Sequence, residues 1–266
     1  MESTGWLTAM DIASLVGVLI CFGGVFAGFS IEGGTPTQLM AISAACIVFG
    51  GAGGATMVAF PLATSINLWK VIMQCYMRPK LDPVPVIKKF VEFSEKVRRE
   101  GLLVLEEDAN NETDPFLRNG LQLVIDGNDT ELVKDILHTD IKFVEERHHV
   151  GAAYLETMAG FTPTFGIVGT VMGLVLVLSN LSDPGSLGPM VAAAFIATLY
   201  GVGSANALFL PWASKLKNAS KEEVLVREIM VEGILSIQAG DNPRIVQEKL
   251  AAFLPPKERS HVKQEG

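Results

Sequence analysis

Residues 159–180 read AGFTPTFGIVGTVMGLVLVLSN, and residues 188–213 read GPMVAAAFIATLYGVGSANALFLPWA. Asp183, in the loop that joins them, is the only formal charge between Glu156 and Lys215. Each run is long enough to cross a bilayer, which takes about 20 residues of helix. Both runs carry Gly, Ala, Thr and Pro where an ordinary membrane anchor carries Leu and Ile. Small residues let helices approach closely, and a hydroxyl inside lipid usually faces protein or a water-lined path, so we interpret the two runs as part of an ion-handling membrane protein.

The composition supports a membrane protein with a polar portion. The chain has 266 residues, of which 49% are hydrophobic, and its mean hydropathy is +0.35. A net charge of -8 argues against a nucleic-acid binder, which needs a basic face. Cys21 and Cys46 fall inside apolar runs and Cys75 just beyond one, so neither a disulfide framework nor zinc-ligand spacing is visible. The N-terminus lacks the features of a signal peptide, so we expect the first apolar run to be retained.

Four windows free of charge predict four membrane spans, placed near residues 12–29, 39–63, 159–178 and 189–213. We therefore expect an all-α, polytopic membrane protein. Two transmembrane hairpins, residues 1–63 and 156–213, flank a helical cytoplasmic domain of residues 64–155. Cytoplasmic C-terminal helices and a tail follow in residues 214–266.

The distribution of basic residues predicts the orientation. All 21 Lys and Arg lie between Lys70 and Arg147 or after Ala213, and the loops 30–37 and 179–188 contain none. Because cytoplasmic loops are enriched in Lys and Arg, both termini and the large insertion should be cytoplasmic.

Within the insertion, apolar residues recur at helical spacing from Val86 to Leu105, which predicts one helix. Arg98, Arg99 and Glu106 project from this predicted helix, and Arg98 and Glu106 are eight residues apart, so they should share a face. Two interpretations stay open: a solvated helix face, or a charged contact surface for another protein.

Further helices are expected along the rest of the polar sequence. Amphipathic spacing and cap residues place them at residues 115–125, 130–137, from Thr139 into the third span, 222–239, and from Pro243 to the prolines at 255 and 256. The tail from Lys257 is expected to be disordered.

No catalytic constellation is visible, so we do not expect an enzyme. The sequence holds no nucleophile elbow, P-loop, HExxH or CxxC motif. The predicted spans contain no Asp, Glu, Lys, Arg or His. Since a proton or cation pump normally needs an ionisable group at membrane depth, the essential carboxylate would have to come from a partner subunit.

The last two spans do offer a polar stripe. Pro163, Gly166, Thr170, Gly173 and Val177 repeat at spacings of three and four, and Ala194, Thr198, Gly201 and Ala205 do the same. Thr170 and Thr198 can offer hydroxyl oxygens, which a hard cation such as sodium favours. Alternatively, each threonine only bonds the carbonyl four residues earlier in its own helix.

Two prolines stand near the expected cytoplasmic ends of these spans. Pro163 and Pro211 each remove a backbone hydrogen bond and can kink a helix. They mark either a hinge or simply a span boundary.

Several stretches together resemble a known family. These are RREGLLVLEE (98–107), LQLVIDGND (121–129), DIKFVEERH (140–148), TPTFGIVGTVMGLVLVLSNLSDPGSLGP (162–189), ATLYG (197–201) and EGILSIQAGDNPRIV (232–246). In order and spacing they resemble the A subunit of the bacterial flagellar stator, the MotA/PomA family, and more closely its sodium-type PomA branch. The first two spans match only loosely.

The resemblance implies a homopentamer in the bacterial inner membrane, surrounding a dimer of a B subunit (MotB or PomB) whose single span carries the ion-binding Asp. Ion flow would turn the ring, and cytoplasmic charges would push the rotor protein FliG. The transported ion would be sodium rather than a proton, and no cofactor is implied.

Single positions carry over from the family motifs. Arg98 and Glu106 fall on rotor-contacting charges, and Arg99 lies where PomA has Lys. Pro163 and Pro211 match the motif prolines, and Thr170 and Thr198 match the threonines of the third and fourth spans in the sodium type. No counterpart is found for an acidic residue that PomA carries near the start of its second span.

Three alternatives remain at this stage. An energiser of the ExbB/TolQ type also forms a pentamer around a partner, but it has three spans with the first one separated from the others. A passive scaffold would not conduct ions. A self-contained transporter is disfavoured because the spans lack charge.

Overall fold

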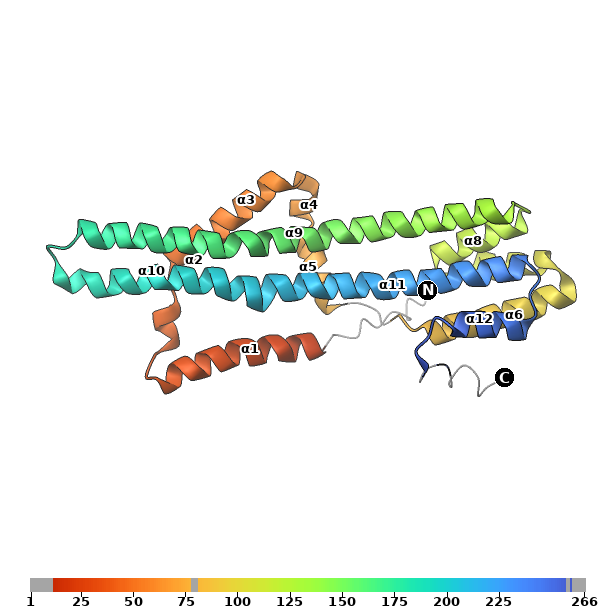
Figure 1. The fold of residues 1–266 in the computed structure, drawn as a ribbon, viewed down its shortest axis with the longest axis horizontal. Coiled ribbons are helices and arrows are strands. Elements are labelled where there is room, and N and C mark those ends of the chain that lie inside the picture. The colour runs from red at the N-terminus through yellow and green to blue at the C-terminus, as the bar shows by residue number, and fades with distance from the viewer. Residues whose placement is uncertain (1–11, 78–80, 257–258, 260–266) are drawn as a thin grey trace. The chain divides into compact units, whose positions relative to one another are not determined.

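The structure is a computed structural model that describes residues 12–77, 81–256 and 259 as helices joined by short turns (Figure 1). The expected all-α class and four membrane spans are confirmed: the elements of the described residues are all helices, and four helical stretches among them are long and apolar enough to cross a membrane. The chain forms two compact units. We call Met1–Pro79 with His148–Asn218 the membrane unit, and Lys80–Arg147 with Ala219–Gly266 the polar unit. The tail expected from Lys257 lies outside the described residues, apart from Arg259.

The first hairpin of the membrane unit begins with α1 (Ile12–Ile31). The second span was expected as one helix over residues 39–63, and this is wrong in detail. It consists of η1 (Pro36–Leu39), α2 (Ile42–Ala45), the π-helical η2 (Cys46–Gly50) and α3 (Gly51–Ala59). It ends early because Phe60 is extended before Pro61, a conformation that proline favours in the residue preceding it. Two short helices follow, α4 (Leu62–Ile66) and α5 (Leu68–Tyr76).

The third and fourth spans are parts of longer helices. α9 runs from Thr130 to Ser179, and α10 (Pro184–Ser204) continues through the π-helical η4 (Ala205–Phe209) into α11 (Leu210–Gln238). A separate helix over 130–137 was expected and is wrong. Thr139 does not cap a new helix, because its hydroxyl donates to the carbonyl of Asp135 at 2.7 Å within the same helix.

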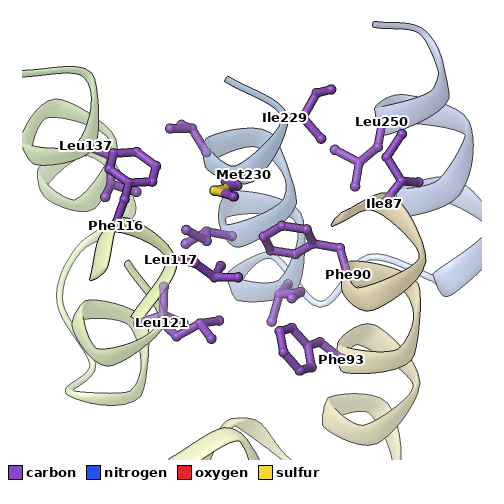
Figure 2. Packing of buried hydrophobic residues seen from close by; sticks show 14 of the residues in the cluster. Ile87, Phe90, Phe93, Phe116, Leu117, Leu121, Leu137, Ile229, Met230 and Leu250 are labelled. Carbon is purple, nitrogen blue, oxygen red and sulfur yellow. The ribbon is translucent and has the colours of Figure 1, made fainter. Parts of the chain in front are cut away.

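The polar unit packs around one apolar core. It contains α6 (Pro83–Glu100), η3 (Leu102–Val104), α7 (Leu105–Asn111), α8 (Pro115–Ile125) and α12 (Pro243–Ala251), with the ends of α9 and α11. Three of these helices start with proline after a capping Asp or Asn, whose side chain accepts a backbone N–H. Figure 2 shows side chains from α6, α8, α11 and α12 converging, and Phe90 and Ile87 are fully buried there.

One expectation about the charged residues of this unit is wrong. Arg98 and Glu106 do not lie on the same helix, because Gly101 ends α6 with a φ of 88°. This left-handed conformation is one that glycine adopts at little cost. An ion pair between Lys96 and Asp108, with the ammonium 2.7 Å from a carboxylate oxygen, joins the two sides of the turn.

A buried carboxylate closes the turn between α7 and α8. The side chain of Glu112 is 5% exposed and forms an ion pair with Lys89 of α6. Its other oxygen accepts the backbone N–H groups of Thr113 and Asp114 at 2.8 and 3.1 Å. Burial raises the pKa of Glu112, but the Lys89 ammonium and these N–H groups outweigh burial, so the net pKa is lowered.

We expect Glu112→Gln to lower the free energy of unfolding at neutral pH by about 1–2 kcal/mol, because it weakens a charge-assisted hydrogen bond. Since the folded pKa of Glu112 is lowered, the stabilisation by its charge is complete above the ordinary value of 4.5. It disappears as the pH falls through the folded pKa. Thermal unfolding midpoints of the two proteins should therefore converge in acid.

The matched control is Glu145→Gln, because Glu145 is exposed and lies within α9, away from the ends of that helix. This variant should unfold like the wild type at every pH. A deficit of Glu112→Gln that stays constant from neutral to acid pH would contradict the account.

Candidate functional site

The backbones of α9 and α10 approach each other closely along a seam of glycines. A Cβ atom added to Gly201 would lie 2.5 Å from the carbonyl oxygen of Thr162, and one added to Gly166 would lie 3.0 Å from that of Ala197. No side chain larger than hydrogen fits at Gly201 without moving backbone. The expectation that small residues serve close packing therefore holds for this hairpin.

The seam brings the two predicted threonines into contact. The hydroxyls of Thr170 and Thr198 form a hydrogen bond with each other. The Thr170 hydroxyl also lies 3.1 Å from the carbonyl of Gly166 and 3.0 Å from that of Ala194. Each hydroxyl has only one proton, so the pair shares these acceptors rather than donating to all of them at once.

This arrangement places four oxygens close together at the middle of two uncharged spans. The bond from Thr170 to Gly166 is the one within its own helix that the sequence left as an alternative, and it coexists with the contact across the helices. Both threonines are half-buried. Hydroxyl and carbonyl oxygens are the ligands that hard cations prefer, so the cluster can contribute to a cation path.

Pro163 lies inside α9 next to the seam, and the helix stays continuous through it. Proline has no N–H, so the carbonyl of Ala159 lacks its usual partner. The buried hydroxyl of Thr162 donates to this carbonyl at 3.3 Å. A side-chain donor thus replaces the missing backbone donor, which is how membrane helices tolerate proline.

Pro211 occupies a different setting, the first turn of α11, directly after the π-helical turn η4. π-Helical turns are rare in proteins, and those that occur are often found at functional sites. The two predicted hinge residues thus lie at different irregularities: Pro163 at a missing backbone hydrogen bond inside α9, and Pro211 directly after a π-helical turn.

Tyr200 is a functional candidate that the sequence analysis missed. Met40 and Ala41 are extended between η1 and α2, so the regular helical hydrogen bonding is interrupted there. The Tyr200 hydroxyl donates to the carbonyl of Leu39 at 2.6 Å and accepts the N–H of Ala41 at 3.2 Å. The sequence feature that could have identified Tyr200 is its position within an apolar span, where a hydroxyl group needs a polar partner.

The predicted rotor-contacting residues lie in the polar unit. Arg98 and Arg99 are in the last turn of α6, and Glu106 is in the first turn of α7. All three are exposed. They are neighbours along the chain on both sides of Gly101, while the threonine pair belongs to the membrane unit.

The chemistry of this molecule is thus that of a membrane helix assembly with a polar oxygen cluster. Among the described residues, no group of three or more His, Cys, Asp or Glu could hold a metal ion. The class defined by the fold and the cluster is a multi-pass membrane protein of the ion-channel type.

Comparisons with known proteins agree with this class. Residues 108–229 match the MotA/TolQ/ExbB proton channel family, and residues 15–101 match the family of motility protein A N-terminal regions. Motility protein A of Borreliella burgdorferi is 38% identical over 256 residues, covering 95% of this chain and 97% of that protein. Chemotaxis protein PomA of Vibrio alginolyticus is 34% identical over 245 residues, covering 92% and 96%.

The fold is also similar to a solved structure. A chain of the flagellar MotAB stator complex from Bacillus subtilis superposes with a TM-score of 0.90 and 34% identity, covering 96% of this chain and 100% of that one. The chain belongs to the MotA/PomA family, as its sequence motifs predicted. This is a family of channel-type subunits of the inner membrane rather than of enzymes.

The role of Tyr200 can be tested by removing one oxygen. In Tyr200→Phe, the Leu39 carbonyl and the Ala41 N–H lose their partner, which should cost about 1–3 kcal/mol in an apolar setting. We expect faster hydrogen exchange at Ala41 and a lower thermal midpoint in detergent. Ser179→Ala is the control, since Ser179 bonds only a carbonyl of its own helix at 2.8 Å. Unchanged protection of the Ala41 amide in Tyr200→Phe would show that the hydroxyl does not hold this segment.

Proposed function

We propose that the chain is the ion-conducting A subunit of a bacterial flagellar stator, which converts ion flow into torque on the rotor together with a B subunit. The observation that carries this proposal is the hydroxyl pair Thr170–Thr198 within the glycine seam of two spans that contain no ionisable residue. Such a wall can line an ion path but cannot supply its charge. A carboxylate on the membrane span of a B subunit completes it.

The family relationship supports the assembly. The solved structures of similar chains are MotAB complexes, which supports a B subunit as partner. From the family resemblance we also propose five copies of this chain around a B-subunit dimer. In the proposed orientation both termini and the polar unit are cytoplasmic. The exposed charges Arg98, Arg99 and Glu106 then face the rotor protein FliG.

We propose the domain boundaries that the sequence predicts, with residues 1–63 and 156–213 as the two transmembrane hairpins, residues 64–155 as the cytoplasmic domain between them, and residues 214–266 as the cytoplasmic C-terminal part. The membrane unit of the fold extends beyond these hairpins, to Pro79, His148 and Asn218. Pro163 and Pro211 lie near the cytoplasmic ends of the second hairpin. There they would transmit a movement of the ion-path helices to the cytoplasmic residues.

The ExbB/TolQ alternative is not favoured. The MotA/TolQ/ExbB family includes those proteins too, but the match to the motility protein A N-terminal region adds the first two spans. Two proteins that are similar over nearly their whole length are the motility proteins A of Borreliella burgdorferi and Bacillus subtilis. Four spans in two hairpins fit the stator.

For the coupling ion we propose sodium rather than protons. Thr170 and Thr198 supply neutral oxygens, which coordinate a hard cation but add no proton-accepting group. Threonine at both positions is also the pattern of the sodium-type branch that the sequence resembles.

The proposal is tested by swimming speed as a function of sodium at constant proton motive force. In cells that rely on this chain, speed should rise with sodium and saturate. In Thr198→Ala we expect the half-saturating sodium concentration to rise by about 5- to 30-fold, because one oxygen ligand worth about 1–2 kcal/mol is lost. Thr198→Ser keeps the oxygen and should stay near the wild type.

The outcomes separate the parts of the proposal. Speed that is independent of sodium would refute sodium coupling and leave a proton-driven stator. A normal sodium response of Thr198→Ala, with normal membrane insertion and assembly, would reduce Thr198 to a packing residue.

A further inference from the structure

An apolar pocket of about 720 Å³ lies in the membrane unit between α1 and the fourth span, and we call it the α1 pocket. Its walls come from the middle of α1, from the segment around η1, from Phe49 of η2, and from residues 199–208 of α10 and η4. None of its lining residues is charged, and neither Thr170 nor Thr198 is among them. The proposed ion path therefore does not use this pocket.

The wall formed by α1 encloses the pocket without filling it. None of the residues Ile12–Ile31 is buried. A Cβ atom added to Gly17, Gly24 or Gly28 would meet no atom within 4 Å, so these glycines do not bring α1 close to another helix of the chain. The space between α1 and the fourth span is consequently left open by the chain itself.

The size of the pocket argues that it does not stay empty. An unfilled cavity destabilises a protein in proportion to its volume. An engineered apolar cavity of about 150 Å³ already binds small apolar molecules such as benzene, and the α1 pocket is about five times larger.

Water does not suit the pocket, because an ordered water needs two to four polar partners. The polar side chains in the lining are engaged with backbone carbonyls. Tyr200 donates to Leu39, Ser204 donates to Tyr200 at 2.6 Å, and the Asn206 amide donates to Val202 at 2.9 Å. The remaining lining is apolar, so the chemistry of the pocket selects an apolar occupant.

The surroundings of the pocket supply such an occupant. Val25, Met40 and Val202 of its lining are 51%, 77% and 46% exposed, so the pocket communicates with the medium around the chain. Around membrane spans that medium is lipid. Residues 199–208 extend about 14 Å along a helix, which is close to half of the hydrocarbon core of about 30 Å. One acyl chain of one leaflet therefore matches the length of the pocket.

A helix of another protein does not match it. A helix with its side chains is about 10–12 Å across, so a length of about 14 Å takes up about 1,100 Å³ or more. This volume exceeds the 720 Å³ of the pocket. A narrow, flexible chain is the better fit.

We propose that the α1 pocket is a lipid site that holds one acyl chain of a membrane phospholipid between α1 and the fourth span. Because no lining residue is charged, the site selects the acyl chain and not the head group. The bound chain supplies the packing that α1 lacks within the protein. This inference goes beyond the proposed stator function and does not depend on ion conduction.

Gly203 offers a way to fill the pocket from inside. It lines the pocket, and a Cβ atom added to it would meet no atom within 4 Å, so Gly203→Leu places four carbon atoms in the space of the lipid without a clash. Excluding two methylene groups, each worth a factor of about 4 in affinity, should lower lipid retention about 15-fold. Gly203→Ala places only one carbon atom there and should give an intermediate loss.

The measurement is native mass spectrometry of the chain with its B subunit, released from nanodiscs of phosphatidylethanolamine and phosphatidylglycerol that have the same acyl chains. Wild-type complexes should retain one phospholipid per copy of this chain, with the two head groups in the proportion of the bilayer. The matched control is Gly188→Leu, which makes the same change in α10, also with no atom within 4 Å of the added Cβ, but outside the pocket. It should retain lipid like the wild type.

The possible outcomes decide the proposal. Equal retention by Gly203→Leu and Gly188→Leu overturns it, and so does retention of only one of the two head groups. If Gly203→Leu instead lowers the amount of assembled complex while each complex keeps its lipids, the pocket receives a second copy of this chain, which overturns the proposal too. None of these results bears on the stator function, whose test is the sodium response of swimming.

Discussion

The close backbone approach of α9 and α10 is the constraint on which the candidate ion path depends. At Gly201 even a methyl group would lie 2.5 Å from the carbonyl of Thr162, so the helices meet there only because the side chain is a hydrogen atom. This proximity brings the hydroxyls of Thr170 and Thr198 together. Since these spans contain no charge, the hydroxyls and the carbonyls beside them are the polar groups that the hairpin can offer to an ion.

α10 is fixed on two sides, and this makes it suitable as a wall of the path. Thr198 contacts α9, while Tyr200, two residues later and therefore about 200° around the helix, holds the extended Met40–Ala41 segment. If a partner subunit that moves against α10 carries the charged group that binds the ion, α10 needs no charge of its own. The polar unit is built in a similar way, because a buried apolar core holds the helices that carry its exposed charged residues.

The membrane spans and the threonine pair could be predicted from the sequence, whereas the break at Gly101 and the contacts between distant residues could not. Four charge-free windows predicted four spans, and spacing of three and four placed Thr170 and Thr198 on stripes that do meet. The break at Gly101 was missed because Leu102 and Leu105 continue the apolar spacing through it, although glycine can adopt its φ of 88°. The hydrogen bonds of Tyr200 connect residues about 160 positions apart, and no local sequence pattern contains such pairings.

The central claim is that this chain provides the uncharged wall of an ion path and a partner provides the acid. Ion flux into vesicles tests it most directly, with the chain alone, with a B subunit, and with a B subunit whose carboxylate in the membrane span is replaced by its amide. The account predicts flux only in the second case, at least about tenfold above the other two, because a neutral site loses the charge that attracts the ion. Equal flux from the chain alone would contradict it.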